Sequence, residues 1–210
     1  MKLIGVTGPI ASGKTMVASL LEEKGAVVIN ADQIAREVVE PGKPAWHEVV
    51  DQFGQDILNE DHNINRRKLG NIVFNNPEKL AILNKIIHPP VIAEIDRRIE
   101  EIEKKYMDGK IVIADVPLLI EVGMHKKCDL TVVVTADRQI RIDRLIRQGL
   151  TKDEAESRIN SQKGKEALEK EADVVIQNNG SLEELKAKVN ELWQQIKGFA
   201  DSGSGSNPQS

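Results

Sequence analysis

Residues 8–15, GPIASGKT, combine residue types that can bind a nucleoside triphosphate. They fit the phosphate-loop pattern of Gly, four residues, Gly-Lys-Ser/Thr. Glycines let the backbone fold around phosphates so that several N–H groups point inward. Lys14 can bridge the β- and γ-phosphate oxygens, and the Thr15 hydroxyl can bind magnesium. The pattern also arises by chance, so the elements around it must show whether it is functional.

The segments on either side of this loop are predicted to position it. KLIGVTG (residues 2–8) is typical of a short buried strand, and KTMVASLLEEKG (residues 14–25) of an amphipathic helix. A working phosphate loop lies between a strand and a helix, because the helix N-terminus adds partial positive charge to the phosphate site. We therefore expect the loop to bind ATP with Mg²⁺. The expected nucleotide contacts are Gly8, Ala11, Ser12, Gly13, Lys14, Thr15 and Met16.

Nucleotide binding alone does not separate a kinase from a GTPase, a motor or a regulatory module. A guanine-specific protein is expected to carry Asn-Lys-x-Asp after a strand. The nearest candidate, NKII at Asn84, lacks the aspartate and lies in a predicted helix. A small-molecule kinase is therefore the leading class. A nucleoside monophosphate or shikimate-type kinase and a non-catalytic nucleotide-binding module stay open as alternatives.

Two aspartates are expected at the carboxyl ends of predicted strands, where ligands bind in open α/β sheets. Asp32 ends AVVINAD, and Asp115 ends KIVIAD. A carboxylate at this position can accept the proton of an acceptor hydroxyl or hold magnesium through water. The alternative is a helix cap for Asp32 and a capping or structural role for Asp115.

Cationic side chains supply further candidates. Arginines recur every third residue in one charged helical pattern, at Arg138, Arg141, Arg144 and Arg147. One or two of them can neutralise charge during phosphoryl transfer, and Arg141 is our catalytic candidate. The alternative is a solvated face that pairs with Asp137 and Asp143. Earlier in the chain, Arg66, Arg67 and Lys68 can either bind an anionic acceptor or merely begin a helix. His88 is either packed or a binding residue.

Strand and helix patterns alternate along most of the chain. AVVINAD, KIVIADVP, DLTVVVT and ADVVIQN are four further predicted strands. Residues 45–106 contain only helical patterns, and a new helix is expected to begin at HPPVIAEI, because a first turn tolerates proline. Thr151 and Glu154 have the spacing of a capping box. The alternation indicates a doubly wound α/β fold with a mostly parallel sheet.

Length and composition set the broad class. The 210 residues suit one medium domain, or a core domain with an inserted lid. A net charge of -4 argues against a nucleic-acid-binding surface. The single cysteine, Cys128, excludes an intramolecular disulfide and fits the cytoplasm. No apolar run approaches the roughly 20 residues of a membrane span. Residues 199–210 form a Gly/Ser-rich tail that is expected to be disordered.

Several motifs together resemble the dephospho-CoA kinase family, over roughly residues 2–198. The phosphate loop is common to many families, so the resemblance rests on the whole ordered set. The motifs are GVTGPIASGKT, INADQIAREVVEPG, RRKLGNIVF, LNKIIHP, IVIADVPLLIE, RIDRLIRQGLTKDEAESRI and ADVVIQNNG. The resemblance implies transfer of the ATP γ-phosphate to the ribose 3′-hydroxyl of dephospho-CoA, the last step of coenzyme A synthesis.

The family resemblance also implies an architecture and residue roles. It implies a P-loop kinase-type core with five parallel strands, a helical substrate-binding insertion (about 45–106) and a helical lid (about 138–172). All three would belong to a single kinase domain, residues 1–198, that acts as a monomer or weak homo-oligomer. Asp32 would be the base that accepts the hydroxyl proton. The acceptor-binding residues would be Thr7, Asp32, Arg66, His88, Asp115 and Leu118.

This chain departs from the family pattern at a few positions. The loop has Gly8-Pro9-Ile10-Ala11 where Gly-Gly-Ile-Gly is frequent, so one backbone donor is lost and a methyl group is added. Asn30 stands where aspartate is common, and Met16 replaces a frequent threonine. We expect a functional loop, because Lys14 and Thr15 are retained.

Overall fold

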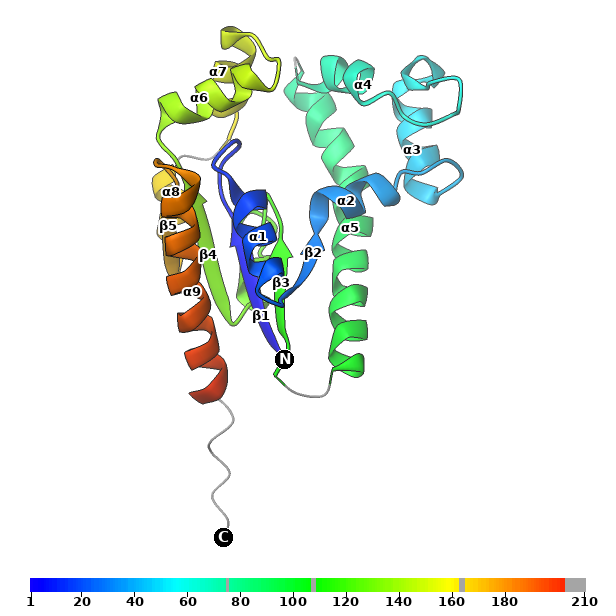
Figure 1. The fold of residues 1–210 in the computed structure, drawn as a ribbon. Coiled ribbons are helices and arrows are strands. Elements are labelled where there is room, and N and C mark those ends of the chain that lie inside the picture. Colours follow the sequence, from blue (N-terminus) through cyan, green and yellow to red (C-terminus); the bar gives the residue numbers. More distant parts are fainter. Residues whose placement is uncertain (75, 107–108, 163–164, 203–210) are drawn as a thin grey trace. The chain divides into compact units, whose positions relative to one another are not determined.

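The fold was determined as a computed structural model that describes residues 1–74, 76–106, 109–162 and 165–202. The chain divides into two compact units, Met1–Ile29 with Lys105–Ser210, and Asn30–Lys104. The first unit is built on a parallel sheet of five strands in the order β2-β3-β1-β4-β5 (Figure 1). The strands are β1 (Lys2–Thr7), β2 (Val27–Asn30), β3 (Ile111–Asp115), β4 (Leu130–Thr135) and β5 (Val174–Gln177). The predicted α/β fold is confirmed.

Alternate residues of the strands build the core of the first unit. Ile4 and Val6 of β1 lie in one cluster with residues of α1 (Lys14–Glu23) and α9 (Leu182–Ser202). These two helices cover one face of the sheet (Figure 1). Because successive side chains of a strand point to opposite faces of the sheet, every second residue of each strand lies on the face that these helices cover.

The central strand β1 leads directly into the phosphate loop. β1 pairs in parallel with β3 on one side and with β4 on the other. Because the strands are parallel, their carboxyl ends meet at one edge of the sheet. Thr7, Asp115 and Thr135 end these three strands, so the loop and Asp115 share that edge.

The charged region after β4 folds into α6 (Arg138–Arg147), α7 (Lys152–Asn160) and α8 (Lys165–Glu169). The predicted capping box is confirmed, since Thr151 and Glu154 each bond the backbone N–H of the other. The last helix, α9, continues to Ser202, so the tail predicted from residue 199 begins too early. Residues 203–210 lie outside the described ranges. Within those ranges no helix is long and apolar enough to cross a membrane.

The second unit is helical. It contains α2 (Ala31–Glu37), α3 (Pro44–Phe53), the 3-10 helix η1 (Gln55–Ile57), α4 (Arg66–Val73) and α5 (Pro77–Lys105). Its core is formed by Val49 of α3, Ile57 of η1, and Leu69 and Val73 of α4, against which apolar residues of α5 pack. The remaining short helix, η2 (Met124–Lys127), belongs to the first unit.

The expectation of a new helix at His88 is wrong. α5 runs through Pro89 and Pro90 as one helix of 29 residues. Prolines inside a helix remove hydrogen bonds and cost about 3 kcal/mol each. Packing holds the helix on both sides of them, because Leu83 and Ile87 contact the core cluster and Val91 is buried.

The predicted strand that ends at Asp32 is too long. β2 stops at Asn30, whose side-chain oxygen accepts the backbone N–H of Gln33 at 2.9 Å and so caps α2. Asp32 therefore lies in the first turn of a helix and not at a strand end. Asp115 does end β3, as predicted.

Candidate active site

The phosphate loop has the backbone shape that its glycines allow. Gly13 precedes α1 with φ of 98°, a left-handed conformation that suits glycine, and an added Cβ would lie 2.2 Å from Asn178 Nδ2. Ala11 also adopts a positive φ, 59°, where the methyl group is unfavourable by about 1–2 kcal/mol. The Ala11 methyl packs with the cluster that includes Ile142 and Leu145 of α6, which offsets part of this cost.

A clamp outside the loop fixes its carbonyl groups; we define it as Arg144 and Asn178. Arg144 Nη1 donates to the carbonyl oxygens of Ala11 and Ser12, at 3.0 Å each, and Nη2 to that of Asn178 at 2.9 Å. Asn178 Nδ2 also donates to the Ser12 carbonyl, at 2.8 Å. Because C=O and N–H of a trans peptide point in opposite directions, the bonds to the Ser12 carbonyl turn the Gly13 N–H away from the clamp.

A third side chain holds the tip of the loop. The Gln162 Oε1 atom, just after α7, accepts the backbone N–H of Ile10 at 2.7 Å. The loop tip is thus bonded to a residue that lies just after α7, within the predicted lid (about 138–172). The Ile10 N–H is therefore available to a phosphate only when its bond to Gln162 breaks.

Lys14 is the first residue of α1 and forms a buried ion pair with Asp115. The Lys14 Nζ and Asp115 Oδ1 atoms are 2.5 Å apart, and the two side chains are 10% and 0% exposed. β1, which leads into the loop, pairs with β3, which ends at Asp115. This pairing brings Lys14 and Asp115 together at the carboxyl ends of the strands. The pair holds the lysine in place beside the loop, and a buried ammonium needs such a partner.

Several polar atoms near these elements have no hydrogen-bond partner in the described residues. They are Ser12 Oγ, Thr135 Oγ1 and Arg141 Nε, all buried. Burial, with the nearby charge of Arg138, lowers the pKa of Arg141. Unpaired buried donors are costly, so they fit a ligand rich in acceptor oxygens such as a triphosphate.

The residues present also fit a magnesium ion that arrives with the triphosphate. The side chain of Thr15 is exposed at the start of α1. The described residues contain no cluster of three or more His, Cys, Asp and Glu side chains. Mg²⁺ in kinases is held by few protein groups together with phosphates and water, so it does not need such a cluster.

Two acceptor-side candidates lie in the first unit beside Asp115. Thr7 is fully buried at the end of β1, and its Oγ1 donates to the carbonyl of Pro117 at 3.0 Å. Leu118 follows in the turn after β3 and is half-buried. The Thr7 bond therefore fixes the start of this turn against the loop strand.

Three other candidates lie in the second unit. Asp32 is exposed in the first turn of α2. The pKa of Arg66 is lowered by partial burial and by the charge of Arg36, while the charge of Asp32 opposes this shift. Burial lowers the pKa of the half-buried His88, which favours its neutral form.

Comparison with known proteins decides which family this arrangement represents. A family model described as dephospho-CoA kinase matches residues 2–184. The chain belongs to the dephospho-CoA kinase family. The dephospho-CoA kinase of Corynebacterium glutamicum is 44% identical over 197 residues, which are 93% of this chain and 98% of the relative.

Two solved structures share the fold of this chain, and one of them is a dephospho-CoA kinase. The dephospho-CoA kinase from Campylobacter jejuni is 27% identical, with a TM-score of 0.69 over 95% of this chain and 99% of the other. TT1252 from Thermus thermophilus is 31% identical, with a TM-score of 0.72 over 93% and 97% of the two chains.

Sequence reasoning identified the loop of this family member but missed the clamp around it. The arginine stripe drew attention to Arg141, whereas Arg144 is the arginine that bonds the loop. Arg138 instead donates to Asn160 at 3.4 Å within the helical region. Period-three spacing shows that the arginines share a face, but the sequence has no signal for the partner of each one.

Proposed function

We propose that this chain transfers the γ-phosphate of ATP to the 3′-hydroxyl of dephospho-CoA, giving coenzyme A and ADP. The observation that carries the proposal is the clamped phosphate loop with its buried Lys14–Asp115 pair, in a chain of the dephospho-CoA kinase family. A loop of fixed shape suits phosphoryl transfer, where catalysis is mainly positioning and charge stabilisation.

On the donor side, loop amides and Lys14 hold the triphosphate. The proposed contacts are Gly8, Ala11, Ser12, Gly13, Lys14, Thr15 and Met16. The Thr15 hydroxyl holds Mg²⁺, which neutralises phosphate charge when it is bound. Arg141, with its unpaired buried Nε, stabilises the charge that develops on the transferred group.

On the acceptor side, Asp32 accepts the proton of the 3′-hydroxyl. The hydroxyl oxygen forms a bond to the γ-phosphorus, and the bond from that phosphorus to the β–γ bridging oxygen breaks. Its electron pair leaves with ADP, so charge and atoms balance. The other proposed acceptor-binding residues are Thr7, Asp115 and Leu118 of the first unit and Arg66 and His88 of the second.

We further propose that residues 1–198 act as one kinase domain with a substrate-binding insertion at about 45–106 and a lid at about 138–172. The compact unit Asn30–Lys104 supports a separate acceptor-binding body. This unit begins before α2, and so earlier in the chain than the proposed insertion at about residue 45. A cytoplasmic, monomeric or weakly oligomeric enzyme fits the family and the single cysteine.

Magnesium-dependent ADP release, coupled to a dehydrogenase, tests the proposal with dephospho-CoA, AMP, CMP, shikimate and no acceptor. Turnover with dephospho-CoA well above the other acceptors is the expected result. Preference for CMP or AMP would favour a nucleoside monophosphate kinase, and preference for shikimate a shikimate-type kinase. ATP binding without turnover of any acceptor would indicate a non-catalytic module.

A further inference from the structure

The backbone N–H groups of the phosphate loop fall into two sets, those that the chain itself bonds and those that it leaves free. Pro9 has no N–H, and the Ser12 N–H donates to the Pro9 carbonyl at 3.1 Å. The Ile10 N–H donates to Gln162 Oε1 at 2.7 Å. The N–H groups without a partner among the described residues are those of Ala11, Gly13, Lys14, Thr15 and Met16. The start of α1 is thus left to phosphate oxygens, whereas the loop tip is held by Gln162.

The side-chain amide of Gln162 has only one orientation that fits this contact. A backbone N–H can only donate, so the carbonyl end of the Gln162 side chain must face Ile10. The Nε2 group is then turned away from Ile10, and it has no hydrogen-bond partner in residues 1–74, 76–106, 109–162 and 165–202. The side chain is only half-buried, so this donor stays accessible to a ligand.

Apolar packing keeps Gln162 beside the loop. Ile10 and Ala11 pack against the apolar cluster of α6 and α7, which includes Ile159. Gln162 follows Ile159 by three residues, and its N–H donates to the Ile159 carbonyl at 3.4 Å. All of these residues belong to the first unit. The contact between the loop tip and the end of α7 therefore rests on packing as well as on one hydrogen bond.

The helices after β4 supply a second donor that the protein leaves unpaired. Arg141 Nε of α6 is buried and has no hydrogen-bond partner among the described residues. Unpaired donors of this kind fit a ligand with many acceptor oxygens. The terminal phosphate of a triphosphate has several free oxygens, so it can accept from loop N–H groups and from a side chain near α7 at the same time.

We propose that Gln162 binds the γ-phosphate of ATP: its Oε1 atom holds the Ile10 N–H, and its Nε2 group donates to a γ-phosphate oxygen. This inference rests on the proposed function for the identity of the donor. The γ-phosphate then joins the loop and the end of α7, whereas ADP lacks this group and leaves Nε2 without a partner. Gln162 therefore favours ATP over ADP, and the contact is lost when the phosphoryl group passes to the acceptor.

Isothermal titration with MgATP and with MgADP, in the absence of acceptor, tests the role of Gln162. Gln162→Met has nearly the length of glutamine but neither polar group. It should weaken ATP binding about tenfold and ADP binding by no more than about threefold. Gln162→Glu keeps an acceptor for the Ile10 N–H but places a negative charge where Nε2 was. It should weaken ATP binding about a hundredfold and ADP binding much less.

Gln148→Ala is the matched control, because it removes an exposed glutamine at the end of α6. It should leave the affinities for both nucleotides unchanged. If Gln162→Glu binds both nucleotides as wild type does, the side chain only holds the loop tip and the proposal fails. An equal loss of ATP and ADP affinity in both Gln162 variants would also overturn it. Tighter ATP binding by Gln162→Met would show instead that Gln162 occupies a donor that a phosphate needs.

Turnover of dephospho-CoA separates this inference from the proposed function. Gln162→Met should raise KM for ATP about tenfold and leave KM for dephospho-CoA unchanged. A rise in KM for dephospho-CoA alone would assign Gln162 to the acceptor and overturn the proposal. Wild-type protein that binds ATP but turns over no acceptor would refute the proposed function, and the ATP and ADP affinities of the variants would still decide the role of Gln162. Circular dichroism of each variant shows whether the fold is retained.

Discussion

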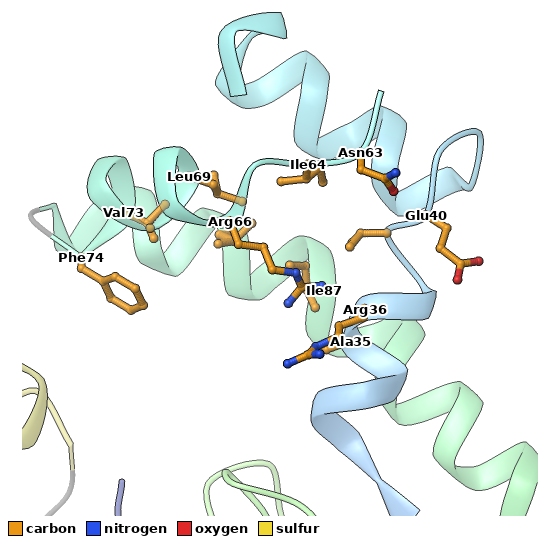
Figure 2. A pocket seen from close by; sticks show the side chains of 13 residues that line it. Ala35, Arg36, Glu40, Asn63, Ile64, Arg66, Leu69, Val73, Phe74 and Ile87 are labelled. Carbon is orange, nitrogen blue, oxygen red and sulfur yellow. The ribbon is translucent and has the colours of Figure 1, made fainter. Parts of the chain in front are cut away.

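The phosphate loop and a pocket of the second unit use cationic side chains in opposite ways. At the loop, Lys14 is buried against Asp115, and Arg144 is occupied by carbonyl groups of the protein. At the pocket, which has a volume of about 520 Å³ and lies between α2, α4 and α5 (Figure 2), Arg36 and Arg66 are exposed and have no partner among the described residues. A loop that binds phosphates through backbone N–H groups must be held in shape by its own chain. A pocket that binds through side chains can leave their charge for the ligand.

The largest expected effect concerns Asp32, the proposed base on α2. Asp32→Asn should lower kcat by about two to four orders of magnitude, because a neutral amide cannot accept the hydroxyl proton. The KM for ATP should not change, since the donor contacts lie at the loop. Single-turnover kinetics measures the chemical step. Wild-type rates would contradict the assignment and leave Asp115 as the candidate base.

A smaller loss of activity, coupled to a loss of stability, is expected at the loop. Lys14→Met should lower kcat/KM by about 10² to 10³, the usual effect of removing a preorganised donor. It should also destabilise the fold by about 3–5 kcal/mol, because the buried Asp115 carboxylate loses its cation. Denaturant unfolding and turnover measure the two effects.

The double variant Lys14→Met, Asp115→Asn separates the two roles of this lysine. It should recover much of the stability, because no buried charge is left uncompensated, while activity stays low. Equal stability of the single and double variants would show that the ion pair does not stabilise the loop region.

An intermediate effect is expected for the clamp. Arg144→Ala removes the bonds to Ala11, Ser12 and Asn178, so the loop loses its shape and KM for ATP should rise about tenfold. Arg147→Ala, at an exposed position on the same helix, is the matched control. Isothermal titration with ATP compares them directly. An equal loss of ATP affinity in both variants would mean that net charge, and not the clamp, is what matters, and unchanged affinity in Arg144→Ala would contradict the role of the clamp.

The smallest expected effect concerns paired charges of the second unit. Hydrogen bonds from Arg97, followed by those from Arg98, lower the pKa of Glu94 from 4.5 to about 2. The folded-state pKa is below the unfolded one, so this stabilisation is complete above about pH 4.5 and is lost as pH falls toward 2. The difference in unfolding free energy between wild type and Glu94→Gln should therefore shrink over that range. A difference that does not depend on pH would contradict this.

Part of the fold was predictable because local patterns specify it. Alternation of apolar runs with amphipathic stretches fixed the five strands, and the capping residues at Thr151 marked the start of α7. Two wrong predictions, the helix start at His88 and the end of β2, have one cause in common. At Pro89 and at Asn30 the local signal was ambiguous, and packing or a side-chain cap decided between two allowed structures.

The sequence by itself determined that this chain has a phosphate loop on a parallel sheet, because glycine spacing, Lys14 and the flanking patterns act over a few residues. It also determined the resemblance to the dephospho-CoA kinase family, through motifs spread along the chain. Only the tertiary structure decided that Lys14 pairs with Asp115, that Arg144 clamps the loop, and that Arg36 meets Arg66. These pairs join residues from 30 to 133 positions apart, and burial and hydrogen bonding across such separations depend on how the elements pack.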